Sequence, residues 1–189
     1  MQEAQPNVEA VVPPLAAAVG AWQELGLELG ETAVVSGEGL LADLFCLAAL
    51  WSGACPVIRL GSRNDSIPGT RCWTVPSDDP EPALEQLASQ LADAPAVAAV
   101  ELTGTAVAAD ILFETIPVYS RLLLGGSGGE PLTIDYYNNI HRKGITVLAR
   151  NIDPAPGVSD ESDTMVRRAR TLVASPERLQ AALDACRES

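Results

Sequence analysis

A glycine turn between an apolar run and a helix-like segment is the feature of this sequence that most constrains its fold. The stretch AVVSGEGLLA begins at Ala33 and has glycines at Gly37 and Gly39. In a dinucleotide-binding βαβ unit the first glycine permits a tight turn and the second lets the backbone approach a pyrophosphate. The third position must be small so that helix and strand pack closely. Ala42 occupies that third position, and Glu38 places a carboxylate between the glycines. The stretch predicts a βαβ fold and leaves open whether it binds a dinucleotide.

Strand-like and helix-like patterns alternate along the rest of the chain. Apolar residues at helical spacing predict helices over 15–25, 40–51, 80–91, 106–116 and 134–142. Short apolar and β-branched runs predict strands over 32–36, 56–60, 72–75, 96–102, 121–124 and 145–149. Residues 11–14 are expected to be an extended lead. The alternation predicts an α/β fold class of the Rossmann type. Its doubly wound, mostly parallel sheet has six strands in the order 3-2-1-4-5-6, with helices on both faces.

The C-terminal part of the chain differs in composition from the alternating part. Residues 151–163 carry two prolines, a glycine and four acids, which is typical of a mobile linker. Helical patterns follow over 165–173 and 176–186. The expected organisation is a Rossmann-like domain over 1–150, a linker over 151–163 and a helical C-terminal extension over 164–189 that packs on the same domain.

Composition excludes several classes of partner. The chain has 189 residues, with 25 acidic and 12 basic side chains and a formal net charge of −13. This charge disfavours nucleic acid and anionic membrane surfaces, because both would repel it. No apolar run approaches the ~20 residues that span a bilayer, and residues 1–12 lack the pattern of a signal peptide. A cytoplasmic location is therefore expected by default.

Neither a metal site nor a catalytic residue is predicted. The cysteines lie at irregular spacings far from the single histidine, His141, so no zinc or CxxC motif is present. Cys46 lies in an apolar helical pattern and is expected to be a small buried side chain. His141 is expected to interact with a helix end. No Tyr-x-x-x-Lys pair or serine nucleophile elbow occurs.

Four segments together resemble the cofactor-binding domain of the medium-chain dehydrogenase/reductase superfamily, which includes the zinc alcohol dehydrogenases. They are residues 29–37, 48–58, 102–104 and 136–147, and the resemblance covers about residues 15–150. The resemblance implies a Rossmann fold. In that family a GroES-like catalytic domain lies mostly before the Rossmann part, whereas only about thirty residues precede the first predicted strand here. The catalytic half is therefore expected to be missing.

The resemblance leaves two expectations for a cofactor. In this fold an acid at the end of the second strand binds the adenosine ribose, whereas this chain has Gly61 followed by Ser62 and Arg63. These residues are similar to NADP-preferring members, where an arginine pairs with the 2′-phosphate; the alternative is a solvated polar loop. Against binding, a carboxylate at Glu38 about 4 Å from a phosphate would cost about 1–4 kcal/mol. No cofactor is the expectation, with NADP as the alternative. The candidate cofactor-binding residues are Gly37, Gly39, Leu40, Ser62, Arg63, Thr103, Gly104 and Gly125.

The last predicted strand would form an exposed sheet edge in a monomer, and unpaired edges favour association. In the resembling family that strand pairs with its twofold mate. A homodimer is therefore predicted, with a related subunit as a substitute partner. The interface residues are expected to be Ile145, Thr146, Val147 and Leu148.

Three functional classes follow from these observations. The favoured one is a stand-alone, catalytically degenerate Rossmann domain that acts as a protein- or peptide-binding subunit, for instance in a biosynthetic pathway. The second is an NADP-dependent oxidoreductase whose substrate surface comes from the C-terminal helices or another chain. The third is a nucleotide sensor that binds a dinucleotide without turnover. Whether the chain is an enzyme stays open, with a binding role favoured.

Overall fold

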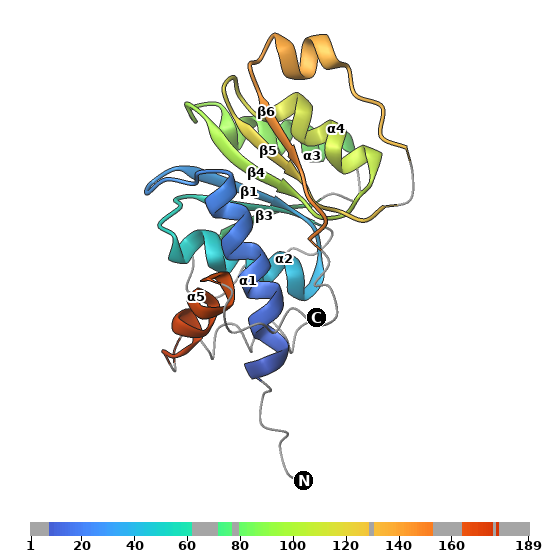
Figure 1. The fold of residues 1–189 in the computed structure, drawn as a ribbon. Helices are drawn as coiled ribbons and strands as arrows, with labels where there is room; N and C mark the ends of the chain where they lie inside the picture. The colour runs from blue at the N-terminus through green and yellow to red at the C-terminus, as the bar shows by residue number, and fades with distance from the viewer. Residues whose placement is uncertain are drawn as a thin grey trace.

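A parallel β-sheet forms the centre of the protein (Figure 1). The computed structural model describes residues 8–61, 72–76, 80–128, 131–152, 164–175 and 177. Within these residues the sheet has six strands in the order β3-β2-β1-β4-β5-β6, and every neighbouring pair is parallel. The predicted order and direction are confirmed. The strands are β1 (Thr32–Ser36), β2 (Val57–Gly61), β3 (Cys72–Pro76), β4 (Val97–Glu101), β5 (Arg121–Leu124) and β6 (Thr146–Ala149).

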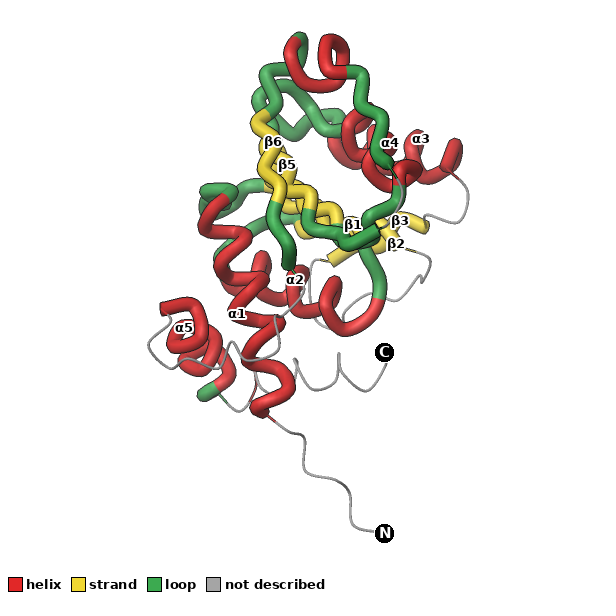
Figure 2. The backbone as a smooth tube through the Cα atoms, turned by 45° about the vertical axis from the view of Figure 1, so that its right-hand side comes forward, coloured by secondary structure: helices red, strands yellow, loops and turns green. Residues whose placement is uncertain are grey.

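Helices cover both faces of the sheet (Figure 2). One hydrophobic cluster joins α1, α2 and α5 to one face, and a second joins α3 and α4 to the other. Within the described residues the ends of the predicted elements are right to within two residues, apart from the start of α1. No helix in the described part of the chain is long and apolar enough to cross a membrane. The helices are α1 (Val8–Glu24), α2 (Gly39–Trp51), α3 (Pro80–Leu91), α4 (Ala106–Thr115), the π-helical turn η1 (Tyr136–His141) and α5 (Thr164–Val173).

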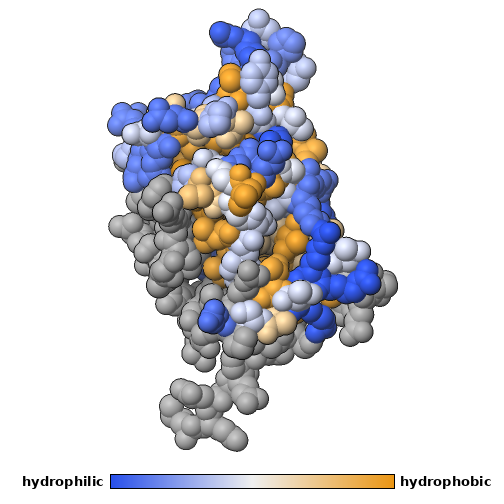
Figure 3. Space-filling model, turned by 90° about the vertical axis from the view of Figure 1, so that its left-hand side faces the viewer, coloured by the Kyte–Doolittle hydropathy of each residue, from blue (hydrophilic) through white to orange (hydrophobic). Residues whose placement is uncertain are grey.

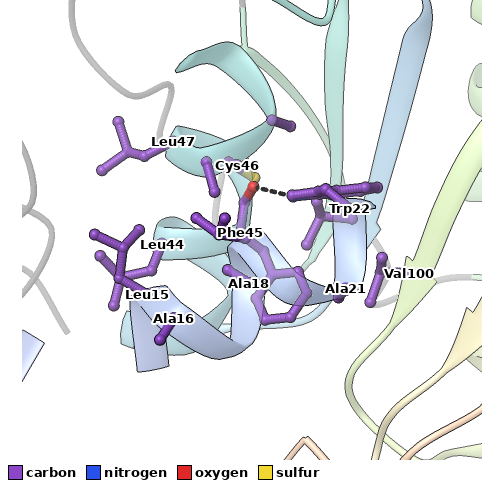
Figure 4. Packing of buried hydrophobic residues seen from close by; sticks show 14 of the residues in the cluster. Leu15, Ala16, Ala18, Ala21, Trp22, Leu44, Phe45, Cys46, Leu47 and Val100 are labelled. Atoms are coloured by element: carbon purple, nitrogen blue, oxygen red, sulfur yellow. Dashed lines mark hydrogen bonds between the residues drawn. The ribbon is translucent and has the colours of Figure 1, made fainter. Parts of the chain in front are cut away.

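The central strands β1, β2 and β4 are buried on both faces because their residues alternate between the two helix layers. In β1, Val35 belongs to the cluster with α1 and α2, whereas Val34 belongs to the cluster with α3 and α4. This burial explains why the strands read as continuous apolar runs. On the first face α1 packs across α2, where Trp22 Nε1 donates to the carbonyl oxygen of Phe45 at 2.9 Å (Figure 4). Cys46 is fully buried in this cluster, as predicted.

The first helix corrects the expectation of an extended lead at residues 11–14. α1 begins at Val8 and contains Pro13 and Pro14. Each proline removes a helical hydrogen bond, which costs about 3 kcal/mol in a helix interior. Val11 and Val12 are only 1% and 2% exposed, and burying such side chains contributes about 1.5–3 kcal/mol each. Packing of the first turns on the core therefore offsets the prolines, a balance that local sequence patterns do not reveal.

The segment after β6 corrects the predicted linker at its start. Ile152 is 3% exposed and belongs to the core cluster of α1 and α2. It packs at the carboxyl end of β5, where a Cβ added to Gly125 would lie 2.1 Å from Ile152 Cδ1. The chain thus returns to the sheet directly after its last strand. Residues 153–163 of the predicted linker lie outside the described residues.

The C-terminal helix α5 packs against α1. Its buried residues Val166, Ala169 and Val173 belong to the same cluster as α1 and α2. On α1 the contact includes Gly20, where an added Cβ would lie 3.5 Å from Met165 Cγ. The helix predicted at 165–173 is confirmed, whereas the one predicted at 176–186 lies almost wholly outside the described residues.

Lys143 joins the turn before β6 to the C-terminal end of α4. Its Nζ donates to the carbonyl oxygens of Phe113 at 2.5 Å, Glu114 at 2.8 Å and Ile116 at 3.2 Å. These are carbonyls that a helix end leaves without intrahelical partners. Burial lowers the pKa of Lys143 below its ordinary value, and the charge of Glu114 opposes that shift. The ammonium group therefore fixes the approach of the last strand to the α4 layer.

We expect Lys143→Met to lower the free energy of unfolding by about 1–2 kcal/mol. Hydrogen bonds from a charged group contribute about 1.5–3 kcal/mol, reduced here because the side chain is partly exposed to solvent. Urea unfolding measures the change. Arg142→Met is the matched control, because Arg142 is exposed and its guanidinium bonds to Asn138 at 3.3 Å. Equal losses in the two variants would contradict the role of Lys143.

Candidate functional site

The candidate site lies at the carboxyl edge of the sheet, where the chain order reverses. β1 is flanked by β2 on one side and β4 on the other, so the connections after β1 and β4 leave in opposite directions. Open α/β sheets bind ligands at such a point. The predicted residues of the three loops gather at this edge, since Gly37 follows β1, Thr103 follows β4 and Gly125 follows β5. Ser62 and Arg63 lie outside the described residues.

The two glycines of the β1–α2 loop serve different purposes. A Cβ added to Gly37 would lie 3.0 Å from Leu102 Cβ and 3.3 Å from Ala42 Cβ, so close packing requires a small residue there. Gly39 has φ +69°, a conformation that favours glycine. Within the described part of the chain, a Cβ added to it would meet no atom within 4 Å. The backbone at Gly39 therefore faces open space at the start of α2.

The N-terminus of α2 is not capped by the side chain that precedes it. Glu38 is the N-cap residue, and its side chain makes no capping hydrogen bond. In contrast, Thr105 caps α4 by accepting from Ala108 N–H at 3.3 Å. Asp135 caps η1 by accepting from Asn138 N–H, and this hydrogen bond is the main reason why the pKa of Asp135 is lowered. The first N–H groups of α2, at the positive end of the helix dipole, can therefore bind an anion.

A buried ion pair holds the β1–α2 loop against β2. Arg59 is in the middle of β2 and only 4% exposed, and its guanidinium pairs with Asp43 of α2. Arg59 Nε also donates to the carbonyl oxygen of Gly37 at 3.2 Å. One side chain thus links strand, loop and helix. This pair was not predicted, although an arginine inside an apolar strand and an aspartate inside an apolar helix were the available signals in the sequence.

A buried carboxylate shapes the loop after β4. Glu101 is 2% exposed and accepts from Thr103 N–H at 2.7 Å, Thr103 Oγ1 at 2.5 Å and Gly104 N–H at 2.9 Å. These donors, which had been predicted to contact a cofactor, bind the protein itself. The role of Glu101 was not predicted, although an acid at the end of an apolar strand was the available signal in the sequence. A contact of Thr103 or Gly104 with a ligand remains a prediction.

The loops after β4 and β5 touch each other through their backbones. A Cβ added to Gly104 would lie 2.0 Å from Gly128 N, and one added to Gly126 would lie 2.0 Å from Gly104 N. Only glycine allows so close an approach. Beside these loops, Ser36 at the end of β1 is fully buried, and its Oγ has no hydrogen-bond partner among the described residues. A buried hydroxyl without a partner costs about 1–3 kcal/mol, so this end of β1 carries an unsatisfied polar group.

Comparisons with known proteins establish the fold. No protein-family model and no curated sequence matches this chain. An alcohol dehydrogenase from Thermotoga maritima superposes with a TM-score of 0.74 at 17% identity, covering 96% of this chain and 50% of that one. Galactitol-1-phosphate dehydrogenase from Escherichia coli gives 0.70 at 19%, covering 95% and 57%. A zinc-binding dehydrogenase from Sinorhizobium meliloti, solved bound to NADP, gives 0.68 at 21%, covering 91% and 49%.

This chain therefore spans about half the length of these dehydrogenases. The likeness shows a dehydrogenase-like Rossmann fold.

We expect Asp43→Asn to lower the free energy of unfolding by about 3–5 kcal/mol, because it leaves the buried guanidinium without its counter-charge. The double variant Asp43→Leu with Arg59→Met should lose less than the single variant, since it removes both charges. Urea unfolding measures both. The control is Glu24→Gln, which breaks the Arg150–Glu24 pair, whose side chains are both 45% exposed; its cost should be below about 1 kcal/mol. A double variant less stable than the single one would contradict the argument.

Proposed function

We propose that this chain is a dinucleotide-binding Rossmann module that acts as a binding subunit. The observation that carries the proposal is the start of α2 at the reversal point of the sheet, which the side chain of the N-cap residue Glu38 does not cap. There the backbone of Gly39 faces open space. A pyrophosphate needs both features, since its charge is stabilised by free N–H groups and its bulk requires a backbone without side chains.

The residues of the loop fit such a ligand. The N–H groups of Gly39 and Leu40 would hold the pyrophosphate, and Gly37 would keep the turn tight enough for α2 to point at it. A nicotinamide dinucleotide supplies hydride chemistry when bound. The Sinorhizobium meliloti structure of the same fold was solved with NADP, which supports a dinucleotide as the ligand class.

On this proposal the chain itself provides binding, either as a nucleotide sensor or as a non-catalytic subunit. If it takes part in a redox reaction, another polypeptide or segment provides the surface that holds the substrate. Hydride transfer requires such a second surface, because the nicotinamide must meet a substrate that is positioned and polarised.

Calorimetric titration with NADH and NADPH tests the nucleotide site. We expect micromolar binding of at least one of them, and a loss of at least about tenfold, or 1.4 kcal/mol, in Gly39→Asn. Asparagine tolerates the positive φ of Gly39, so the variant adds a side chain with little backbone strain. Gly30→Asn is the matched control, because Gly30 has φ +81° and equally open surroundings. No heat at millimolar nucleotide would refute the site.

A second proposed function is association through β6. Within the described residues β6 is the last strand of the sheet. The N–H of Thr146 bonds to Ser120 and that of Arg150 bonds to Leu124, both at 3.1 Å. Because successive strand residues direct their N–H groups to opposite sides, those of Val147 and Ala149 point to the free edge. This edge favours the predicted homodimer or a related partner.

The side chains around this edge refine the proposed interface. Ile145 is only 6% exposed and packs in the protein's own core, and Val147 and Leu148 are half-buried against the two clusters. The exposed Thr146 and the outward backbone groups of β6 would therefore provide most of the contact with a partner. The turn η1 projects beside the edge, at the top of Figure 1, and is hydrophilic in Figure 3. Its Tyr137 is 60% exposed and stacks on His141 with centroids 5.6 Å apart. His141 is the last residue of η1 and is exposed to solvent.

Val147→Pro tests the edge. We expect light scattering to show a dimer for the wild type and half that mass for the variant, because proline removes an N–H that points away from β5. Val147→Thr keeps that N–H and nearly the same shape, so it should stay dimeric. Circular dichroism checks that both variants fold. A folded Val147→Pro dimer would exclude this interface.

A further inference from the structure

We propose that Glu38 recognises the adenosine ribose, and that the site therefore prefers a nucleotide with a free 2′-hydroxyl, such as NAD(H), over one with a 2′-phosphate. The inference rests on the proposed nucleotide function of the β1–α2 loop. It gives a specificity-determining role to the residue between the two glycines. It also replaces the expectation that Glu38 repels the ligand and that Arg63 selects NADP.

The glycine at position 61 is explained by packing. Gly61 ends β2, where dinucleotide-binding folds carry the acid that accepts hydrogen bonds from the ribose. A Cβ added to Gly61 would lie 2.9 Å from the carbonyl oxygen of Gly37. This separation is shorter than a van der Waals contact, so no side chain fits unless the loop moves. The missing acid at position 61 is therefore not by itself evidence for a 2′-phosphate.

The loop is not free to move away from position 61. Arg59 Nε binds the carbonyl oxygen of Gly37 at 3.2 Å and also lies near the end of β2, 3.5 Å from the Cβ position of Gly61. The same guanidinium is buried against Asp43 of α2. Displacing the loop would break both interactions and leave buried charge without partners. The loop and the end of β2 thus form one rigid unit.

Glu38 brings a carboxylate to this place from the loop. Its Cγ lies 3.7 Å from the Cβ position of Gly61, and its carboxyl group is one bond further along the side chain. The carboxylate of a strand-end acid would occupy this same region. Glu38 is exposed, and its side chain does not cap α2. A ligand at the start of α2 would therefore meet this side chain beside the end of β2.

The chemistry of a carboxylate decides which ribose it accepts. An ionised carboxylate only accepts hydrogen bonds, so the hydroxyls of an unmodified ribose can donate to it. A 2′-phosphate is anionic and has no such donors, so the nearby carboxylate of Glu38 would repel it. The net charge of −13 for the chain adds to the repulsion.

Titration of the full-length chain with NADH and NADPH tests this assignment. We expect the wild type to bind NADH at least tenfold more tightly than NADPH. Glu38→Gln should reduce that ratio at least fivefold, because the amide keeps the shape and removes the charge. Glu81→Gln, which removes an exposed acid in the first turn of α3, controls for net charge and should leave the ratio unchanged. Thermal melting checks that each variant folds.

Two results would overturn the inference and leave the nucleotide site standing. One is a wild type that binds NADPH as tightly as NADH or more tightly, which would point to Arg63. The other is a ratio of NADH to NADPH affinity that Glu38→Gln changes no more than the control Glu81→Gln does. A wild type that binds neither nucleotide would instead refute the proposed function, and this inference with it.

Discussion

A guanidinium buried beside the sheet organises the first βαβ unit. A charge removed from water costs several kcal/mol unless it is paired, so Arg59 must keep both Asp43 and the carbonyl oxygen of Gly37. These partners come from a helix and from a loop. Because Arg59 binds both partners at once, it fixes the positions of β2, α2 and the β1–α2 turn relative to one another. The small residues Gly37 and Ala42 then follow as the ones that fit the remaining space.

The carboxyl edge of the sheet is arranged by charges that the strands themselves carry. Arg59 of β2 holds the loop after β1, and Glu101 of β4 holds the loop after its own strand through Thr103 and Gly104. Both side chains are almost fully buried. The loops thus take their shape from the sheet, while their glycines let backbones approach closely. Gly39 differs from the others, because its surroundings are open.

The order of the strands could be predicted from the sequence because it depends on local alternation and on general rules of connection. The features that were missed depend on contacts between distant segments. Asp43 and Arg59 are each a charge in an apolar element, but their pairing requires knowing that α2 covers β2. The early start of α1 and the burial of Ile152 likewise depend on the core that receives them. Of the candidate site, the placement of Gly37 and Gly39 followed from the motif, and the roles of Glu38 and Gly61 required the structure.

The prolines of α1 have a consequence for the order of folding. Pro13 and Pro14 weaken the first half of this helix as an isolated segment, since both remove hydrogen bonds and short helices are marginal in water even without prolines. Its Trp22 completes its contacts only when Phe45 of α2 is in place. α1 precedes β1 and α2 along the chain and is therefore expected to become helical only after both have been synthesised. Until then the nascent chain carries α1 as an exposed apolar stretch, of the kind that chaperones bind.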